Sequence, residues 1–171
     1  MYKRQYILRE TKTRKEYKIA LEQNITIEWG KTLNLTIENE KMKGKVKITK
    51  ISEDDNLITG EVAGTPIANV KFEIYDDSGK LVDTLITKAD GIAISKDLVV
   101  GKYIVKEKET GEYYEINEND FEVEITKNGE VVGLTISNKS KTPPPEKPKE
   151  ETPKIEVPPI EPIKKLPVTG Y

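Results

Sequence analysis

Residues 44–50 read Gly-Lys-Val-Lys-Ile-Thr-Lys, with an apolar side chain at every second position from Val46. The same alternation recurs in 70–74, Val-Lys-Phe-Glu-Ile, and in 121–125, Phe-Glu-Val-Glu-Ile. Successive side chains of a β-strand point to opposite faces, so this period is typical of strands with one buried face. Similar short runs lie at 81–86, 103–105 and 134–136. About seven strands between residues 44 and 139 predict an all-β, antiparallel β-sandwich.

Turn-forming residues separate these runs, as a sandwich of short strands requires. Asp76-Asp77-Ser78-Gly79 and Ala89-Asp90-Gly91 are two of these turns. A third, Asn128-Gly129, predicts a tight two-residue hairpin, because both residues tolerate positive φ.

Composition excludes several classes of function. The 171 residues carry 28 Lys and Arg against 30 Asp and Glu, a net charge of −2, whereas nucleic-acid binding requires a basic excess. The chain has no His and no Cys, which removes Ser-His-Asp and Cys-His nucleophiles, His/Cys zinc sites and disulfides. We therefore expect no turnover enzyme, metal or cofactor, no nucleic-acid partner, and a monomer.

Two blocks of sequence occur twice in the chain. Residues 101–110 match residues 4–13, and residues 129–138 match residues 30–39. The spacing between the Glu of the first block and the Asn of the second block is 31 positions in the later copy and 29 positions in the earlier one. Two unrelated β-hairpins can look alike, but here both blocks agree in order and spacing. Residues 1–40 are therefore predicted to be the C-terminal part of a preceding copy of the same domain.

Strand alternation also places polar residues on the inward face. Lys50 falls on the same face of its strand as Val46 and Ile48. Glu107 falls on the face of Tyr103 and Val105, and Asn138 on the face of Leu134 and Ile136. A buried Lys or Glu is costly unless paired, so the three are expected to meet inside the domain. The alternative is that each lies one step beyond its strand, where the face reopens to water. Glu10 and Asn39 repeat the pattern in the earlier copy.

The end of the chain has a different composition. Nine of the ten prolines lie at or after Pro143, and residues 140–165 contain almost nothing that could form a core. Such a segment is expected to be an extended, polyproline-like spacer, or else a plain disordered linker.

Several segments of the chain resemble one known family, the collagen-adhesin B-type repeat. This family is also called the SpaA-like prealbumin-fold domain of Gram-positive surface proteins. The resemblance covers residues 44–139 whole and 1–40 in part. The segments that carry it are 44–50, 68–75, 101–107 and 134–138.

The resemblance implies a self-formed cross-link. In the family, a Lys on the first strand and an Asn or Asp on the last join through an isopeptide bond, assisted by a Glu. By position, Lys50 matches the amine, Asn138 the acceptor and Glu107 the acid. The chemistry implied is a single-turnover self-modification that releases ammonia. Glu10 and Asn39 have no matching Lys strand before them, so the incomplete copy is expected to form no bond.

The last residues resemble the sortase recognition motif, Leu-Pro-any-Thr-Gly. The match is Leu166-Pro167-Val168-Thr169-Gly170. The resemblance implies cleavage between Thr169 and Gly170, with sortase and peptidoglycan as partners. The family's signal continues into an apolar span, whereas this chain stops at Tyr171, so we expect a fragment of a longer protein.

These expectations divide the chain and suggest a function. The predicted function is a structural stalk of an extracellular protein, covalently anchored to a Gram-positive cell wall. Two alternatives remain: an adhesin module that binds a host extracellular-matrix protein, and a pilin subunit that sortase polymerises. The predicted parts are an incomplete repeat at 1–40, a complete domain at 44–139, a spacer at 140–165 and a sorting motif at 166–170.

Overall fold

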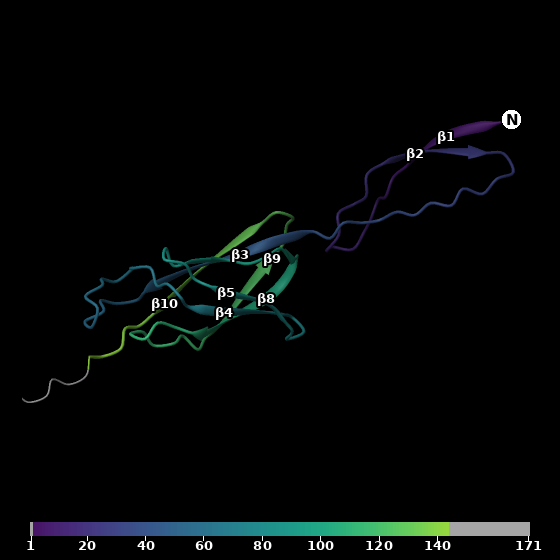
Figure 1. Cartoon of the computed structure of the whole chain (residues 1–171). Coiled ribbons are helices and arrows are strands. Elements are labelled where there is room, and N and C mark those ends of the chain that lie inside the picture. The colour runs from purple at the N-terminus through teal and green to yellow at the C-terminus, as the bar shows by residue number, and fades with distance from the viewer. Residues whose placement is uncertain (1, 144–171) are drawn as a thin grey trace, which may run out of the picture.

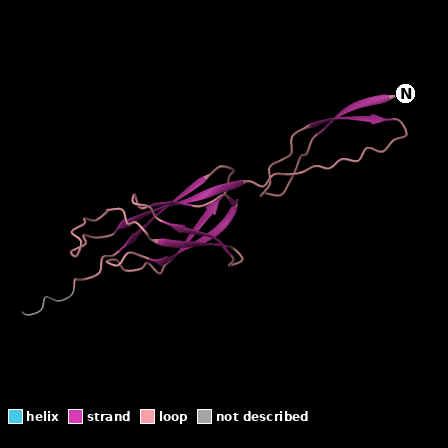
Figure 2. Ribbon diagram, viewed as in Figure 1, coloured by secondary structure: helices cyan, strands magenta, loops and turns pink. Residues whose placement is uncertain are grey.

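The computed structural model describes residues 2–143, and within that range every regular element is a β-strand (Figure 2). The prediction of an all-β fold is confirmed. The same range contains no helix of the length and apolarity that crossing a bilayer requires. The strands are β1 Lys3–Leu8, β2 Gln23–Glu28, β3 Lys43–Ser52, β4 Lys71–Asp76, β5 Leu81–Ile86, β6 Ile92–Ile94, β7 Leu98–Val99, β8 Gly101–Glu109, β9 Asp120–Ile125 and β10 Val131–Asn138.

Strands β3 to β10 form two sheets that enclose one core (Figure 1). One sheet has the order β10-β3-β6, with β7 also paired to β3, and the other has the order β5-β4-β8-β9. The alternation seen in the sequence is the alternation of burial. Val46 and Ile48 in β3, Phe72 and Ile74 in β4, and Val105 in β8 have no solvent exposure.

One strand pairing differs from an all-antiparallel sandwich. The first strand, β3, and the last, β10, run parallel, with Lys50 opposite Ile136 and Ser52 opposite Asn138. The other described pairings in the sandwich are antiparallel. Side chains alternate in the same way in parallel and in antiparallel strands, so the sequence pattern could not reveal that β3 and β10 run parallel.

The predicted hairpin at Asn128-Gly129 is wrong. Gly129 does adopt a positive φ of 77°, as a tight turn requires. However, β9 and β10 belong to different sheets, and the turn carries the chain from one sheet to the other. Turn chemistry sets local backbone angles, whereas the partner of each strand depends on distant contacts.

Residues 2–40 form a separate antiparallel hairpin, β1–β2, that lies beyond the start of β3 and away from the sandwich (Figure 1). Its register resembles that of β8 and β9. Tyr6 pairs with Ile25, as Tyr103 pairs with Val123. Single bridges also correspond, from Tyr17 to Lys41 and from Tyr114 to Ser140. The two segments thus share local backbone geometry, while the hairpin lacks a facing sheet within residues 2–143.

Candidate functional site

The end of β3 brings a lysine into the core. Burial alternates without interruption through this strand, so the inward row of Val46 and Ile48 continues to Lys50, which has no solvent exposure. Glu107 on the inward row of β8 is 5% exposed, and Asn138 at the end of β10 is 2% exposed. Because β3 and β10 are neighbours and β8 belongs to the facing sheet, the three side chains converge between the sheets.

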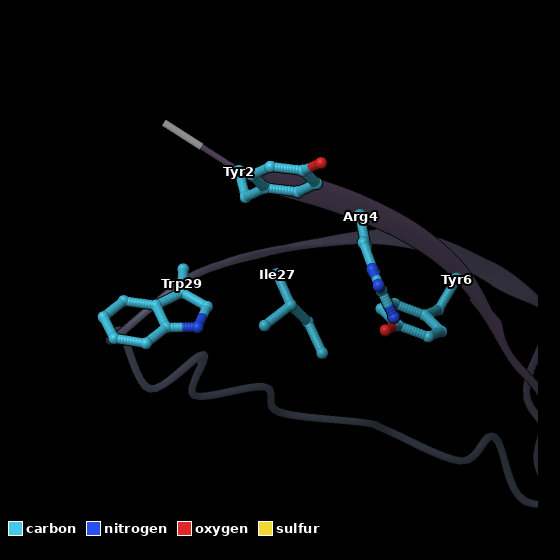
Figure 3. A pocket seen from close by; sticks show the side chains of 5 residues that line it. All are labelled: Tyr2, Arg4, Tyr6, Ile27 and Trp29. Atoms are coloured by element: carbon cyan, nitrogen blue, oxygen red, sulfur yellow. The ribbon is translucent and has the colours of Figure 1, made fainter.

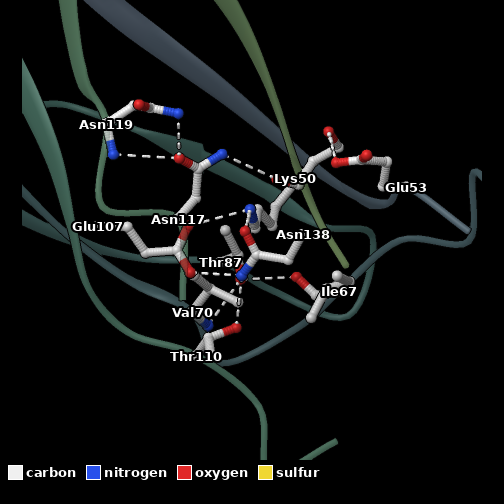
Figure 4. Close-up of polar contacts among 11 residues, drawn as sticks. Lys50, Glu53, Ile67, Val70, Thr87, Glu107, Thr110, Asn117, Asn119 and Asn138 are labelled. Atoms are coloured by element: carbon white, nitrogen blue, oxygen red, sulfur yellow. Dashed lines mark hydrogen bonds and ion pairs between the residues drawn. The ribbon is translucent and has the colours of Figure 1, made fainter. Parts of the chain in front are cut away.

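The three polar side chains contact one another directly (Figure 4). Lys50 Nζ donates a hydrogen bond to Asn138 Oδ1. It also lies 3.0 Å from Glu107 Oε2 in a fully buried ion pair. Asn138 Nδ2 donates one hydrogen bond to Glu107 Oε1 and a second to Thr110 Oγ1, at 2.8 Å. Amine, carboxylate and carboxamide therefore form one closed cluster.

The surroundings of this cluster favour a neutral amine. Burial lowers the pKa of Lys50 from its ordinary value of 10.5, because an ammonium in the core loses its hydration. The neighbouring carboxylate of Glu107 opposes this shift, and that of Glu53 opposes it less. Phe72, itself fully buried, places its ring centroid 6.0 Å from Lys50 Nζ. An apolar wall on one side and a single carboxylate on the other leave the amine poorly solvated.

Glu107 is bound unevenly. Its Oε1 accepts the hydrogen bond from Asn138, whereas its Oε2 is the one buried side-chain polar atom without a hydrogen-bond partner within residues 2–143. The 3.0 Å approach of Lys50 Nζ to Oε2 is an ion-pair contact outside hydrogen-bond geometry. Each oxygen of the carboxylate thus faces a different nitrogen: Oε1 faces the Asn138 amide and Oε2 faces the Lys50 amine.

The hairpin of residues 2–40 holds a similar but more exposed cluster. Asn39 Nδ2 donates hydrogen bonds to Glu10 Oε2 at 2.6 Å and to Thr13 Oγ1 at 3.1 Å. The backbone N–H of Ala20 also donates to Glu10, and with Asn39 it lowers the pKa of that carboxyl. Among the ion pairs of residues 2–143, none involves Glu10, so this cluster has the acid and the carboxamide but no amine.

Thr110 and Thr13 are the site residues that the strand pattern missed. Each follows the Glu of its cluster by three positions and accepts a hydrogen bond from the Asn. Strand alternation would point Thr110 outward from β8. However, β8 ends at Glu109, so alternation no longer applies at Thr110. The only signal in the sequence was that the two matching blocks 101–110 and 4–13 both end on a Thr.

An open hollow of about 830 Å³ lies on one face of the β1–β2 hairpin, remote from Lys50 (Figure 3). Its aromatic side chains are largely exposed: Tyr2 by 79% and Trp29 by 84%. The corresponding face of β8 and β9 is core, where Tyr103 and Ile125 are buried. The hollow therefore lies on the face of the hairpin that corresponds, by strand register, to the buried face of β8 and β9. Its lining residues are Tyr2, Arg4, Tyr6, Ile27 and Trp29.

No metal centre is formed by the described part of the chain, where no group of three or more Asp or Glu side chains could hold an ion. The sorting motif, 166–170, and nearly all of the predicted spacer, 140–165, lie outside the described residues.

Comparison with known proteins identifies the fold family. The model of the SpaA family, described as a prealbumin-like fold domain, matches residues 44–140. This chain belongs to the SpaA prealbumin-like family. The predicted family and the prealbumin-like fold are thus confirmed, and the SpaA domain of this chain is the sandwich of β3 to β10.

Two curated relatives share sequence with this chain. The trypsin-resistant surface T6 protein of Streptococcus pyogenes is 33% identical over 81 residues, covering 47% of this chain and 15% of that protein. The collagen adhesin of Staphylococcus aureus is 34% identical over 99 residues, covering 50% of this chain and 8% of that protein. This chain thus spans a small part of either relative.

Solved structures extend the similarity. The Bacillus anthracis TIE protein is 30% identical, with a TM-score of 0.69 over 81% of this chain and 25% of that one. GBS52, a minor pilin of Streptococcus agalactiae, is 22% identical, with a TM-score of 0.50 over 84% of this chain and 63% of that one. The likeness to GBS52 concerns the fold alone.

Proposed function

We propose that the SpaA domain is a structural segment of a Gram-positive surface protein, stiffened by an isopeptide bond between Lys50 and Asn138. The observation that carries this proposal is the buried contact of an amine with a carboxamide, bridged by one carboxylate. A free lysine in a core is costly, and conversion to an amide removes the charge. The relatives named surface protein and adhesin favour an extracellular location.

The proposed reaction uses Glu107 to carry a proton from one nitrogen to the other. Oε2 lies beside Lys50 Nζ and takes a proton from the attacking amine. Nζ bonds to Asn138 Cγ, and the bond from Cγ to Nδ2 breaks. The carboxyl group of Glu107, which lies beside Nδ2, then turns so that this same proton faces Nδ2 and delivers it to that nitrogen, which leaves as ammonia. Atoms balance, because the amine and carboxamide become one secondary amide plus ammonia, and Glu107 ends as it began.

Holding the amine and the carboxamide together lowers the barrier of the proposed reaction. The fold fixes Nζ against the carboxamide and excludes bulk water, so a bimolecular reaction becomes intramolecular. The event happens once for each molecule, and the chain is not a turnover enzyme. The product would join the first strand of the domain, β3, to the last, β10. Such a bond slows unfolding and resists pulling from either end.

Intact-mass measurement of the purified full chain tests this proposal. The wild type is expected to be lighter than calculated by one ammonia, and Lys50→Ala is expected to restore the calculated mass. Lys47→Ala is the matched control, because Lys47 lies on the outward row of β3 and should leave the ammonia loss intact. A folded wild type with the calculated mass would eliminate the cross-link.

We further propose that residues 1–40 are the C-terminal part of a preceding repeat. The shared strand register and the cluster of Glu10, Thr13 and Asn39 favour this assignment. Because no lysine pairs with Glu10 within residues 2–143, the chain should lose one ammonia and not two. Peptide mapping should therefore recover Asn39 unmodified.

Attachment to peptidoglycan through Leu166–Gly170 is the remaining part of the proposed function. Purified sortase with an oligoglycine nucleophile should cleave the chain after Thr169 and append the nucleophile there. Thr169→Ala is expected to abolish the product. Recovery of uncleaved wild-type chain would remove the anchor from the proposal.

Matrix binding is a second candidate function, favoured by the relative named collagen adhesin. A third, polymerisation as a pilin, is favoured by the neighbour GBS52 only through its fold. Immobilised collagen, fibronectin and fibrinogen separate the first two candidates. Saturable binding of the full chain to one of these proteins would favour the adhesin over a purely structural stalk.

A further inference from the structure

Asn138 is held from both sides of its side chain. Its Oδ1 accepts a hydrogen bond from Lys50, and the two N–H groups of Nδ2 donate separately to Glu107 and Thr110. A primary carboxamide is planar, and both of its N–H bonds lie in that plane. Two acceptors at fixed positions, with Lys50 at Oδ1, therefore restrict the orientation of this plane more closely than Lys50 and one acceptor would.

The plane matters because a nucleophile adds to a carbonyl carbon from above or below it. We infer that Thr110 is a positioning residue for the cross-link, fixing the Asn138 carboxamide so that Cγ faces the Lys50 amine. This inference rests on the proposed isopeptide bond and adds a residue to it. Misplacing a reacting atom by a fraction of an ångström is enough to slow such a reaction.

The placement of Thr110 agrees with this role. Glu107 lies in β8 and Thr110 one residue beyond its end, so a single rigid strand presents both acceptors. Thr110 Oγ1 is 2.8 Å from Asn138 Nδ2. Losing this contact would leave one N–H group of the buried carboxamide unpaired, with only Lys50 at Oδ1 and Glu107 at Nδ2 to hold it.

The hairpin of residues 2–40 repeats the arrangement independently. Thr13 Oγ1 lies 3.1 Å from Asn39 Nδ2, and Glu10 accepts from the same nitrogen. No lysine side chain pairs with this acid among the described residues. The Asn39 nitrogen nevertheless contacts a Glu and a Thr at the same spacing from each other, and also the Lys18 carbonyl at 2.9 Å. The Thr contact is thus a feature of the acceptor and does not depend on the amine.

A time course of cross-linking in the full chain tests the role of Thr110. The chain is made by cell-free translation and quenched in acidic denaturant, and intact mass gives the fraction that has lost ammonia. Thr110→Val is expected to slow the loss by about tenfold, the effect of one hydrogen bond on a barrier. Thr110→Ser keeps an oxygen at the same place and should react at close to the wild-type rate.

A matched control separates positioning from stability. Thr87 is buried, accepts a hydrogen bond from Val70 and donates one to Ile67, and it forms no hydrogen bond with Lys50, Glu107 or Asn138. Thr87→Val should lower the melting temperature and leave the rate of ammonia loss near that of the wild type.

Three results would overturn the role of Thr110: a wild-type rate in Thr110→Val, equal slowing in Thr87→Val, or no recovery in Thr110→Ser. If ammonia loss in Thr110→Val is already complete at the first time point, as in the wild type, the variant is scored as reacting at the wild-type rate. A wild type that never loses ammonia would overturn the cross-link itself, which is a separate outcome.

Discussion

Two nitrogen atoms face the carboxylate of Glu107, the Lys50 amine on one oxygen and the Asn138 amide on the other. Oε1 accepts a hydrogen bond from Asn138, whereas Oε2 has only the 3.0 Å ion-pair contact with Lys50. At the scale of single residues, this placement of the two nitrogens is what the proposed cross-linking reaction requires of Glu107. The lowered pKa of Lys50 belongs to the same organisation, since a protonated amine cannot attack.

The lowered pKa of Lys50 predicts a pH-dependent stability once the bond is prevented. Asn138→Ala removes the acceptor and keeps the buried amine. Between the lowered pKa and the ordinary value of 10.5, the unfolded chain binds a proton that the folded chain has released. The free energy of unfolding should therefore rise with pH across this window and level off above it.

Urea denaturation at several pH values measures this effect. Other lysines also titrate near pH 10, so the comparison is with the double variant Lys50→Met/Asn138→Ala, which lacks the buried amine. The single variant should gain more stability with rising pH than the double variant. Identical profiles, or a gain on acidification, would contradict the burial of a titrating amine.

At the scale of elements, the lysine strand is held by close backbone contacts. The backbone N–H of Lys50 donates a hydrogen bond to the carbonyl oxygen of Gly91, in the turn before β6, at 2.8 Å, and a Cβ at Gly91 would overlap the Lys50 carbonyl oxygen. The glycine also has a positive φ of 70°. The turn that the sequence marked at Ala89-Asp90-Gly91 thus positions β3 as well as reversing the chain.

Gly91→Ala is expected to destabilise the domain more than Gly79→Ala. Both glycines have positive φ, 70° and 79°, so both variants are strained, but a Cβ at Gly79 meets nothing within 4 Å. The additional loss at Gly91 should be about 1–3 kcal/mol, the usual effect of overpacking. Urea denaturation in the Lys50→Ala background measures both variants without a cross-link. Equal losses would mean that the contact with Lys50 contributes nothing.

At the scale of the whole molecule, the proposed bond would close a loop of 88 positions between β3 and β10. Every strand of the sandwich other than these two lies inside that loop. A cross-link of this span restricts the unfolded chain, and the chain-entropy account assigns it about 4–5 kcal/mol. It also retards unfolding from both ends, because β3 and β10 are the strands through which the domain connects to the rest of the chain.

Loss of the bond should therefore be visible in proteolysis and melting. Lys50→Ala and Glu107→Gln each prevent the reaction by a different change, one removing the nucleophile and the other the proton carrier. Both are expected to melt at lower temperature than the wild type and to be digested faster by trypsin. A melting temperature equal to that of the wild type in both variants would contradict a stabilising cross-link.

Local patterning was sufficient to assign the class of fold and the inward side chains. A period of two marks each strand and its buried face, and Lys50, Glu107 and Asn138 lie on those faces because alternation is a property of the chain itself. Long-range packing was needed for the rest: the parallel neighbours β3 and β10, the turn at Gly129 that changes sheets, and the contact of Thr110 with Asn138. These features depend on contacts between segments that are far apart in the sequence, and the local pattern of side chains does not determine such contacts.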